Sequence, residues 1–430
     1  MIPRDRMATT VLEVPESQLI RYSRWALAVT VACLPLYVLR FRIGPLPSTL
    51  LEVLILVTVG LYAAGRFQAR AWIPVRTSLE IPIALFVIAG AIGIAVSPDH
   101  VGALGLYRAY FIEPIVLFYV AVDLLRTRND FRAVLAGFVG GSTVFALMNL
   151  GAWVIAIATN VDIDLGNAPK ALYTSPNSVA MFLEPAVCLA AGFALYSDDR
   201  RDRIAALVCL PVLLASLVAT LSRAGLLTLA LLAILAVLTL RSRRRLKLAL
   251  LGALAVGGLA MLQVPFIAKR LANQFDLSYP YNTFEGRLQI WSDTFRMLRD
   301  HPIFGAGLRG YATVMRPYVT TPKGLPELYA HNIFLSMWVE IGLLGLAAFV
   351  VLLALLLWKG WSSFSKAEGF PRALLWGTSA SFVALVVHGQ FDTPYYGNDL
   401  SVEFWLIAAL EIAAIAAFCR PTTGKTGLQR

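Results

Sequence analysis

Residues that could act on a phosphorylated substrate are concentrated in one late stretch of the chain. It holds three motifs: Arg287-Leu-Gln-Ile-Trp291, His301-Pro-Ile-Phe-Gly305-Ala-Gly307, and His331-Asn332 before an apolar run. An arginine side chain matches phosphate oxygens with paired hydrogen bonds, and a histidine ring exchanges a proton near neutral pH. The motifs therefore indicate chemistry on a phosphorylated lipid at the outer face of a membrane.

His331 is the main candidate for a general base. It stands where a polar loop meets a long apolar segment, and we expect Asn332 to cap the helix that begins there. The positive end of that helix disfavours the imidazolium form, so the ring would stay neutral and able to accept a proton. A position at the boundary between loop and membrane also suits a substrate that is anchored by a lipid tail.

Arginine and glycine residues could bind the phosphate groups. Residues 204–240 are too long for one membrane crossing, so Ser222-Arg223-Ala-Gly225 is predicted to form a tight outer turn. An arginine held there costs free energy unless an anion pairs with it. Gly305 and Gly307 permit a turn whose backbone N–H groups converge on an anion, although paired glycines mark many turns.

Other polar residues are better explained as ordinary surface groups. Arg296, Arg299 and Arg316 are expected to face headgroups or solvent, and His301 to end a helix. Asp162-Ile-Asp164 is typical of acid pairs that hold a metal, but no histidine is near it in the sequence. We therefore predict no metal site.

The composition is that of an integral membrane protein. The chain has 430 residues, of which 58% are hydrophobic and 15% charged, against about 25% charged in soluble domains. We predict one all-α, polytopic membrane domain, residues 1–430, with about twelve transmembrane helices. The predicted spans are 25–39, 46–65, 79–96, 106–125, 133–158, 177–196, 204–221, 225–240, 248–265, 333–358, 373–389 and 400–418.

The distribution of Lys and Arg predicts the orientation of these spans. Short segments on one side hold 24 of the 37 Lys and Arg residues, and short segments on the other side hold 5. The positive-inside rule then places both termini in the cytoplasm and a long loop, about 266–332, outside. The net charge of +11 follows from this topology and does not indicate nucleic-acid binding.

The long outer loop is predicted to contain two helices. Apolar residues at three- and four-residue spacing predict a helix over 286–300 that lies flat on the membrane with this stripe inward. The stripe comprises Leu288, Trp291, Phe295 and Leu298. Asn282 or Thr283 could cap this helix, and Pro302 follows its end. A second short helix is predicted to carry Arg309 and Arg316 and to end at Pro317.

Together the motifs resemble those of the O-antigen ligase and O-antigen polymerase superfamily of bacterial membrane glycosyltransferases. The resemblance covers nearly the whole chain, and four motifs carry it: Ser222-Arg223-Ala-Gly225; Arg287-xxx-Trp291 followed by His301-Pro-xx-Gly305-x-Gly307; His331-Asn332, nine residues, then Gly342-xx-Gly345; and His388-Gly-Gln-Phe-Asp392-Thr-Pro394. The third is similar to the ligase pattern and gives a weak preference for that branch.

The resemblance implies transfer of a glycan from undecaprenyl diphosphate to an acceptor hydroxyl at the periplasmic face of the bacterial inner membrane. In the ligase the acceptor is a sugar of lipid A-core. In the polymerase it is the end sugar of another lipid-linked repeat, and a third branch glycosylates proteins. An inverting reaction without a metal or other cofactor is implied. The choice between ligase and polymerase stays open.

The residue roles follow from this resemblance together with the chemistry above. Catalysis is assigned to His331, which takes the proton of the attacking hydroxyl, and to Arg287 and Arg223, which stabilise the departing diphosphate. Substrate binding is assigned to four loop residues: Arg309, Gly305, Gly307 and Asn332. The roles of four other residues stay open: Arg108, Asp162, Asp164 and Asp392.

A transporter or flippase of lipid-linked sugars is the alternative from another class. Twelve spans with both ends inside would suit it. However, the charged and glycine motifs lie in one late outer loop, and the two halves of the chain do not mirror each other. A structural scaffold would explain none of the arginine and histidine placement. We therefore favour the enzyme.

The charge bias gives a prediction about topology. In a variant without native cysteines, a single cysteine replacing Pro322 or Asp164 should react with a membrane-impermeant thiol reagent in intact spheroplasts. One replacing Ser242 should react only after the membrane is broken, because its neighbours form a basic inner segment. Labelling at position 242 from outside would invert the loop and its chemistry.

Overall fold

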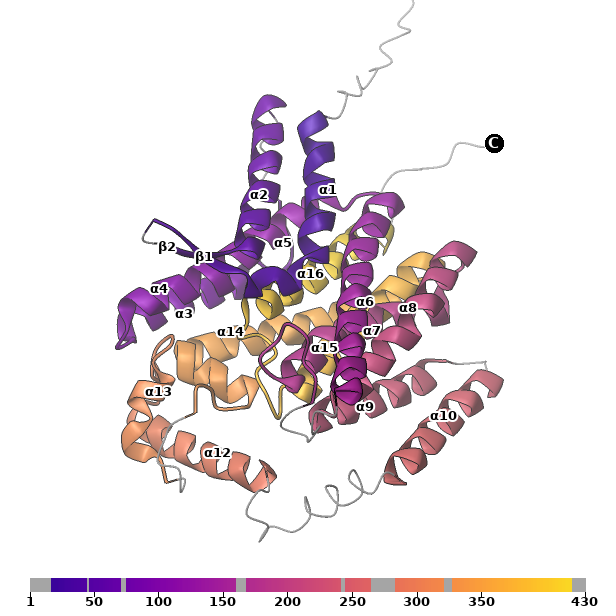
Figure 1. Ribbon diagram of the computed structural model, residues 1–430. Coiled ribbons are helices and arrows are strands. Elements are labelled where there is room, and N and C mark those ends of the chain that lie inside the picture. Colours follow the sequence, from indigo (N-terminus) through magenta and orange to yellow (C-terminus); the bar gives the residue numbers. More distant parts are fainter. Residues whose placement is uncertain are drawn as a thin grey trace, which may run out of the picture.

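The structure is a computed structural model that describes residues 17–44, 46–70, 75–159, 168–240, 244–263, 283–320 and 327–419. Long helices dominate the described part of the chain (Figure 1). The predicted positions Asn282, Asp162, Asp164, Ser242 and Pro322 lie outside the described residues. Each of the twelve predicted spans overlaps a helix, which confirms the all-α, polytopic class.

The helices and the single hairpin of the described residues follow one another along the chain. The first half contains α1 (Gln18–Ala32), η1 (Leu34–Val38), β1 (Arg40–Ile43), β2 (Leu46–Thr49), α2 (Leu50–Gln68), α3 (Glu80–Val96), α4 (His100–Tyr107), η2 (Arg108–Ile112), α5 (Glu113–Leu124), α6 (Arg128–Ala158) and α7 (Pro176–Tyr196). The second half contains α8 (Arg200–Ala219), α9 (Arg223–Thr239), α10 (Arg244–Leu262), α12 (Thr283–Asp300), α13 (Tyr311–Val314), η3 (Arg316–Tyr318), α14 (Ile333–Phe364), α15 (Gly369–His388), α16 (Asn398–Ala414) and η4 (Ile415–Cys419).

Eight of the described helices are long and apolar enough to cross a membrane. They are Leu50–Gln68, His100–Leu124, Arg128–Ala158, Pro176–Tyr196, Arg200–Ala219, Ile333–Phe364, Gly369–His388 and Asn398–Cys419. The helices α3 and α9 are also apolar but have only 17 residues each. The chain is thus an integral membrane protein, and the count of about twelve spans stays a prediction.

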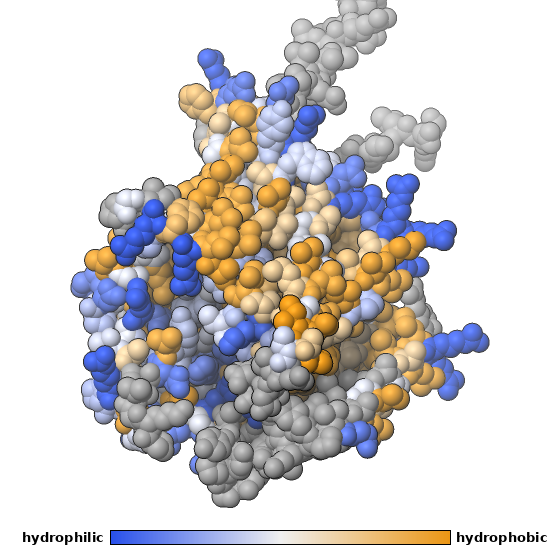
Figure 2. All heavy atoms as spheres, in the orientation of Figure 1, coloured by the Kyte–Doolittle hydropathy of each residue, from blue (hydrophilic) through white to orange (hydrophobic). Residues whose placement is uncertain are grey.

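Exposed apolar side chains match this assignment. Figure 2 shows hydrophobic residues gathered in a broad region of one face, with hydrophilic residues toward its margins. Large apolar side chains are exposed on several spans, including Phe67 at 75%, Val154 at 67% and Val208 at 66%. So much exposed apolar surface is typical of helices that contact lipid.

The first predicted span is displaced and is followed by strands. The helix α1 begins at Gln18 and ends at Ala32. Pro35, which lacks a backbone N–H and cannot continue the α-helix, lies in the first turn of the 3₁₀ helix η1. The strands β1 and β2 then form an antiparallel hairpin that pairs Arg40 with Thr49. Gly44 takes a φ of 60° in the turn. The sequence analysis did not predict this hairpin.

The outer-loop helix is confirmed, but its buried face differs from the predicted stripe. The helix α12 buries Asp293, Thr294, Met297 and Leu298, whereas Leu288 and Phe295 are 43% and 47% exposed. The hydroxyl of Thr294 lies 2.7 Å from that of Tyr311, so the buried face packs against α13. Tertiary contacts, and not apolar periodicity alone, thus determine which face points into the protein.

The second loop helix is shorter than predicted. Arg309 precedes α13 and has a φ of 60°, so it does not belong to a helix. Pro317 lies inside the 3₁₀ helix η3, whose first turn can accommodate a proline. It therefore does not mark the end of a helix. The expectation of one helix through Arg309 and Arg316 was therefore wrong.

A break in α14 receives the loop that contains Gly305 and Gly307. The helix leaves helical geometry at Ile341 and Gly342. The loop replaces the lost helical hydrogen bonds, since Ala306 N–H donates to Val339 O at 2.7 Å and Leu343 N–H donates to Ile303 O at 2.9 Å. The loop before α14 is thereby joined to a long apolar helix by backbone hydrogen bonds.

The two loop glycines are required by close contacts. Gly305 and Gly307 have φ values of 66° and 79°. A Cβ atom on Gly305 would lie 2.2 Å from Val339 O, and one on Gly307 would lie 2.5 Å from Ser97 N. Both contacts are with backbone, which cannot move aside as a flexible side chain can.

Gly307→Ala should therefore destabilise the protein. The left-handed backbone and the contact with Ser97 together should lower the free energy of unfolding by about 1–3 kcal/mol or more. Gly286→Ala is the matched control, because a Cβ atom there meets nothing within 4 Å in α12. Thermal unfolding of the purified proteins would measure both changes, and equal midpoints for the two variants would contradict this account.

Candidate active site

One face of α12 holds the two segments that carry His331 and Asp392. Arg287 Nε donates to Phe391 O at 2.8 Å, and Trp291 Nε1 donates to Ala330 O at 3.0 Å. Residues four apart share a helix face, so the Arg-xxx-Trp spacing lets both side chains point the same way. The two accepting carbonyls belong to the residues immediately before Asp392 and His331.

His331 and Asp392 lie next to each other. His331 Nδ1 is 3.5 Å from Asp392 Oδ1, a separation typical of an ion pair rather than of a well-formed hydrogen bond. The side chain of His331 is 31% exposed, whereas that of Asp392 is 12% exposed. His331 also has a φ of 49°, a left-handed conformation that is uncommon for residues other than glycine. The ring is therefore held against a carboxylate and remains accessible.

The carboxyl of Asp392 is held in its ionised form. Burial opposes ionisation, yet the interaction with His331 and the positive charges of His388 and Arg287 lower the pKa of Asp392 to about 2. Asn177 Nδ2 donates to Oδ2 at 3.0 Å, and the Thr393 N–H donates to Oδ1 at 3.0 Å. The sequence analysis quoted Asp392 within a motif but gave it no role.

The start of α14 is joined to the end of α15. Asn332 Oδ1 accepts from the N–H groups of Phe334 and Leu335 at 3.0 and 3.1 Å, which confirms its predicted place as the helix N-cap. The N–H of Ile333 donates to Gly389 O at 2.7 Å, and Asn332 Nδ2 donates to Gln390 O at 3.3 Å. A substrate-binding role of Asn332 stays a prediction.

Behind this junction lies a buried ion pair. His388, the last residue of α15, places Nδ1 2.7 Å from Glu184 Oε1 of α7, and both side chains are at most 2% exposed. The N–H of Asp392 donates to His388 O at 3.1 Å. The pair thus fixes the end of α15 from which the Asp392 segment continues.

Arg223 lies in the predicted tight turn. The helix α8 ends at Ala219, α9 begins at Arg223, and Ser222 Oγ accepts from Gly225 N–H at 3.2 Å. A Cβ atom on Gly225 would lie 3.0 Å from that of Ala180, so this turn packs against the first turns of α7. Asn177, which contacts Asp392, lies on the same turns. The catalytic role of Arg223 stays a prediction.

Arg309, Gly305 and Gly307 contact other helices. The N–H of Leu308 donates to Gly93 O at 3.0 Å, and the N–H of Arg309 donates to the carboxylate of Glu340. The guanidinium of Arg309, 61% exposed, lies 3.5 Å from Asp99. The backbone donors that were predicted to bind an anion here thus bind protein atoms, including one carboxylate. Substrate binding by these residues stays a prediction.

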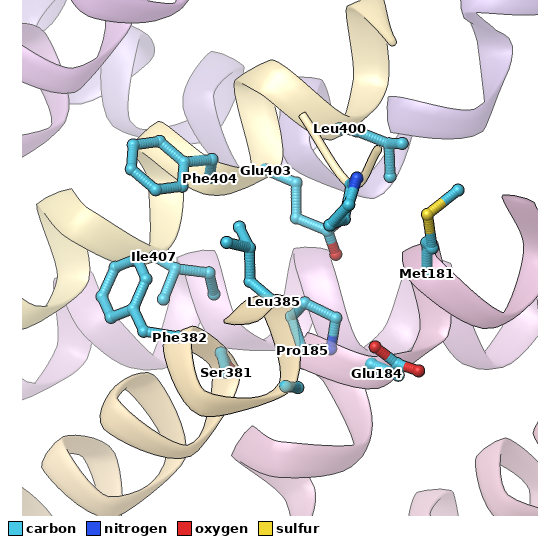
Figure 3. A pocket seen from close by; sticks show the side chains of 12 residues that line it. Met181, Glu184, Pro185, Ser381, Phe382, Leu385, Leu400, Glu403, Phe404 and Ile407 are labelled. Atoms are coloured by element: carbon cyan, nitrogen blue, oxygen red, sulfur yellow. The ribbon is translucent and has the colours of Figure 1, made fainter. Parts of the chain in front are cut away.

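A small cavity lies among α7, α15 and α16 (Figure 3). Glu184 and Glu403 line it together with apolar side chains such as Met181, Pro185 and Phe404. Its volume of about 20 Å³ has room for one or two water molecules. A sugar ring is far larger, so this cavity does not hold a glycan.

Possible metal ligands were also considered. Among the residues that the structure describes, no group of three or more His, Cys, Asp or Glu side chains could hold a metal ion. Asp162 and Asp164, the one acid pair singled out in the sequence, are not among them. The structure therefore leaves the predicted absence of a metal untested.

Comparison with known proteins bears on the family. Residues 205–350 match the family model described as O-antigen ligase. None of the curated proteins matches the chain. The matched segment runs from α8 into α14 and contains Arg223, Arg287 and His331. The match shows that this segment is similar to O-antigen ligases, in agreement with the motifs quoted above.

Proposed function

We propose that the protein transfers a glycan from undecaprenyl diphosphate to an acceptor hydroxyl at the periplasmic membrane face. The observation that carries this proposal is the contact between His331 and Asp392, held by two side chains of α12. A base oriented by a carboxylate is a recurrent arrangement for activating a hydroxyl. The match over residues 205–350 supports the same class of reaction.

His331 acts as the general base. Because Nδ1 faces Asp392, Nε2 is the nitrogen that accepts the acceptor's hydroxyl proton. The acceptor oxygen forms its bond to the anomeric carbon while the bond from that carbon to the diphosphate oxygen breaks. The electron pair of the broken bond leaves with the diphosphate. Asp392 stabilises the imidazolium, which then returns its proton to solvent.

Arg287 and Arg223 stabilise the departing diphosphate. The Nε of Arg287 is engaged by Phe391 O, so its two terminal amino groups are the donors that remain for phosphate oxygens. Arg223 starts α9, where the positive end of the helix dipole also favours an anion. These cations take the place that a divalent ion occupies in other glycosyltransferases, and the reaction inverts the anomeric centre without a metal.

The acceptor is a sugar of lipid A-core if the protein is a ligase. It is the end sugar of a second lipid-linked repeat if the protein is a polymerase. The spacing from His331 to Gly342 and Gly345 favours the ligase, and in the structure Gly342 is the break in α14 that receives the outer loop. Assays with each acceptor in turn decide between the two.

Replacing His331 tests the base. We expect His331→Ala and His331→Gln to lose most glycan transfer by the purified protein, because neither side chain can take up the proton. Binding of the lipid-linked donor should change little. His301→Gln is the control, since His301 is an exposed histidine of the same loop. Substantial transfer by His331→Gln would instead make His331 an orienting residue, and a transporter would give no glycosidic product at all.

The same assay gives a pH profile that reports on His331. We expect transfer to fall as the solution is acidified from pH 8 to pH 5, because a protonated imidazole cannot take up the proton of the attacking hydroxyl. Asp392 cannot cause this fall, because its pKa is lowered to about 2 and its carboxyl stays ionised throughout that range. A profile that is flat from pH 8 to pH 5 would contradict the assignment.

Replacing Arg287 tests the donor-side cation. Arg287→Ala removes one preorganised transition-state donor, so we expect a loss of about a hundredfold or more. Arg287→Lys keeps the charge but not the planar fork and should also lose much of the activity. Arg299→Lys, at an exposed position of α12, is the matched control. Near-normal transfer by Arg287→Ala at equal expression would refute the role. Transfer should also survive a strong chelator, and sensitivity would direct attention to Asp162 and Asp164.

A further inference from the structure

Tyrosine side chains from five separate segments gather near the parts of the chain that carry His331 and Asp392. The rings of Tyr329 and Tyr396 have centroids 5.9 Å apart, and those of Tyr110 and Tyr396 are 6.4 Å apart. The ring of Tyr37 lies 5.6 Å from that of Tyr173. We call Tyr37, Tyr110, Tyr173, Tyr329 and Tyr396 the tyrosine cluster.

Charged groups link the two halves of the cluster. The hydroxyl of Tyr173 donates to Asp399 Oδ2 at 2.6 Å. The charges of Asp399 and Arg40 act on the hydroxyls of both Tyr37 and Tyr110. The segments η1 and η2, which carry Tyr37 and Tyr110, both pack against α16. The phenol groups therefore converge on one region and do not merely line separate helices.

Three of the hydroxyls lack a protein partner. Tyr37, Tyr110 and Tyr329 are half-buried, and no residue in the described part of the chain hydrogen bonds to their hydroxyl groups. The neighbouring Tyr173 and Tyr395 differ, because they donate to Asp399 and to Tyr110 O. A buried tyrosine normally finds such a partner. The three open hydroxyls are thus available to a ligand.

The position of Tyr110 depends on an irregular turn. It lies in η2, a π-helical turn between α4 and α5, and such turns are frequent at functional sites. The backbone of the turn is held from outside, since Tyr395 donates to Tyr110 O at 2.7 Å and Asn398 donates to Ala109 O at 3.2 Å. The segment that carries Asp392 thus also fixes Tyr110.

The cluster adjoins the reacting pair along the backbone. Tyr329 is two residues before His331, so their Cα atoms are at most about 7 Å apart. Tyr396 is four residues after Asp392. A group bound between these rings would therefore lie next to the segments that carry His331 and Asp392.

We propose that Tyr37, Tyr110 and Tyr329 bind a sugar ring next to the bond that forms. A sugar ring has apolar C–H faces and a rim of hydroxyl groups, and a tyrosine offers an apolar face together with one hydroxyl at low conformational entropy. A lipid tail would match aliphatic side chains, and a phosphate would match an excess of cations. The charges that act on these three hydroxyls are instead mixed, since Arg40 and Arg309 are opposed by Asp399 and Glu340. The inference rests on the proposed function for the identity of its substrates.

Binding to the full-length protein tests this subsite without any need for turnover. The probes are undecaprenyl-diphosphate-linked glycan and lipid A-core, each compared with its sugar-free lipid. Tyr329→Ala and Tyr37→Ala should weaken binding of one glycan probe about tenfold, the effect of losing one ring contact and one hydrogen bond. Binding of the sugar-free lipids should not change. The probe that is affected identifies the sugar as belonging to donor or acceptor.

Phenylalanine variants and a control complete the experiment. Tyr329→Phe and Tyr37→Phe keep the ring, so they stay informative if an alanine variant fails to fold, and each should lose a smaller part of the affinity. Tyr318→Phe is the control, because Tyr318 bonds to Asp300 at the surface of the loop. Unchanged binding of both glycans by all four cluster variants would overturn the subsite. A wild-type protein that binds glycan but forms no product would instead count against the proposed function.

Discussion

Two hydrogen bonds from α12 to backbone carbonyls set the distance between His331 and Asp392. The acceptors, Ala330 O and Phe391 O, belong to segments that precede α14 and follow α15. Neither segment is regular, so the contacts from α12 add to the two hydrogen bonds that join the segments directly. An arginine and a tryptophan are suited to this, because each combines an apolar body with a directional N–H donor. Arg287 and Trp291 of α12 therefore position His331 and Asp392 by holding the backbone carbonyls of the preceding residues.

The same loop is fixed to the membrane helices at a second place. The break in α14 exposes Val339 O and the N–H of Leu343, and the segment before Arg309 satisfies both. A backbone group left without a partner at this depth would cost several kcal/mol. Gly305 and Gly307 therefore allow this segment to pack closely against the backbone of neighbouring helices. The anion that the N–H of Arg309 binds is the carboxylate of Glu340, a part of the protein.

Acidic residues within the spans find different partners, as their surroundings require. Glu52 and Glu113 lie 2.9 and 3.3 Å from Arg108, which gives that arginine a structural place, and Glu184 pairs with His388. Glu411 instead accepts from Thr378 and Ser379. The partners of these acids thus include an arginine, a histidine and hydroxyl groups. In a low-dielectric interior a hydroxyl or a histidine stabilises a carboxyl as an arginine does, and the sequence does not reveal which neighbour will be near.

Local sequence was sufficient for features that depend on nearest neighbours. Apolar length gave the helices and the polytopic class, and Asn332 before an apolar run gave an N-cap, because capping needs only the next three residues. The turn at Ser222 was predictable from the length of the apolar segment around it, which is too long for one membrane crossing.

Features that join distant segments required the tertiary structure. Asp392 lies 61 positions after His331 and Arg287 lies 104 positions before Phe391, so no periodicity relates them. The buried face of α12 carries Asp293 and Thr294, because Thr320 and Tyr311 of α13 supply their hydrogen-bond partners. The tyrosine cluster likewise combines five segments whose spacing in the chain is irregular. The sequence by itself determined which residues could do chemistry and in which kind of element they lie. Only the packing of α12, α14 and α15 decided which of them meet, because hydrogen bonds between distant segments depend on position in space and not on order in the chain.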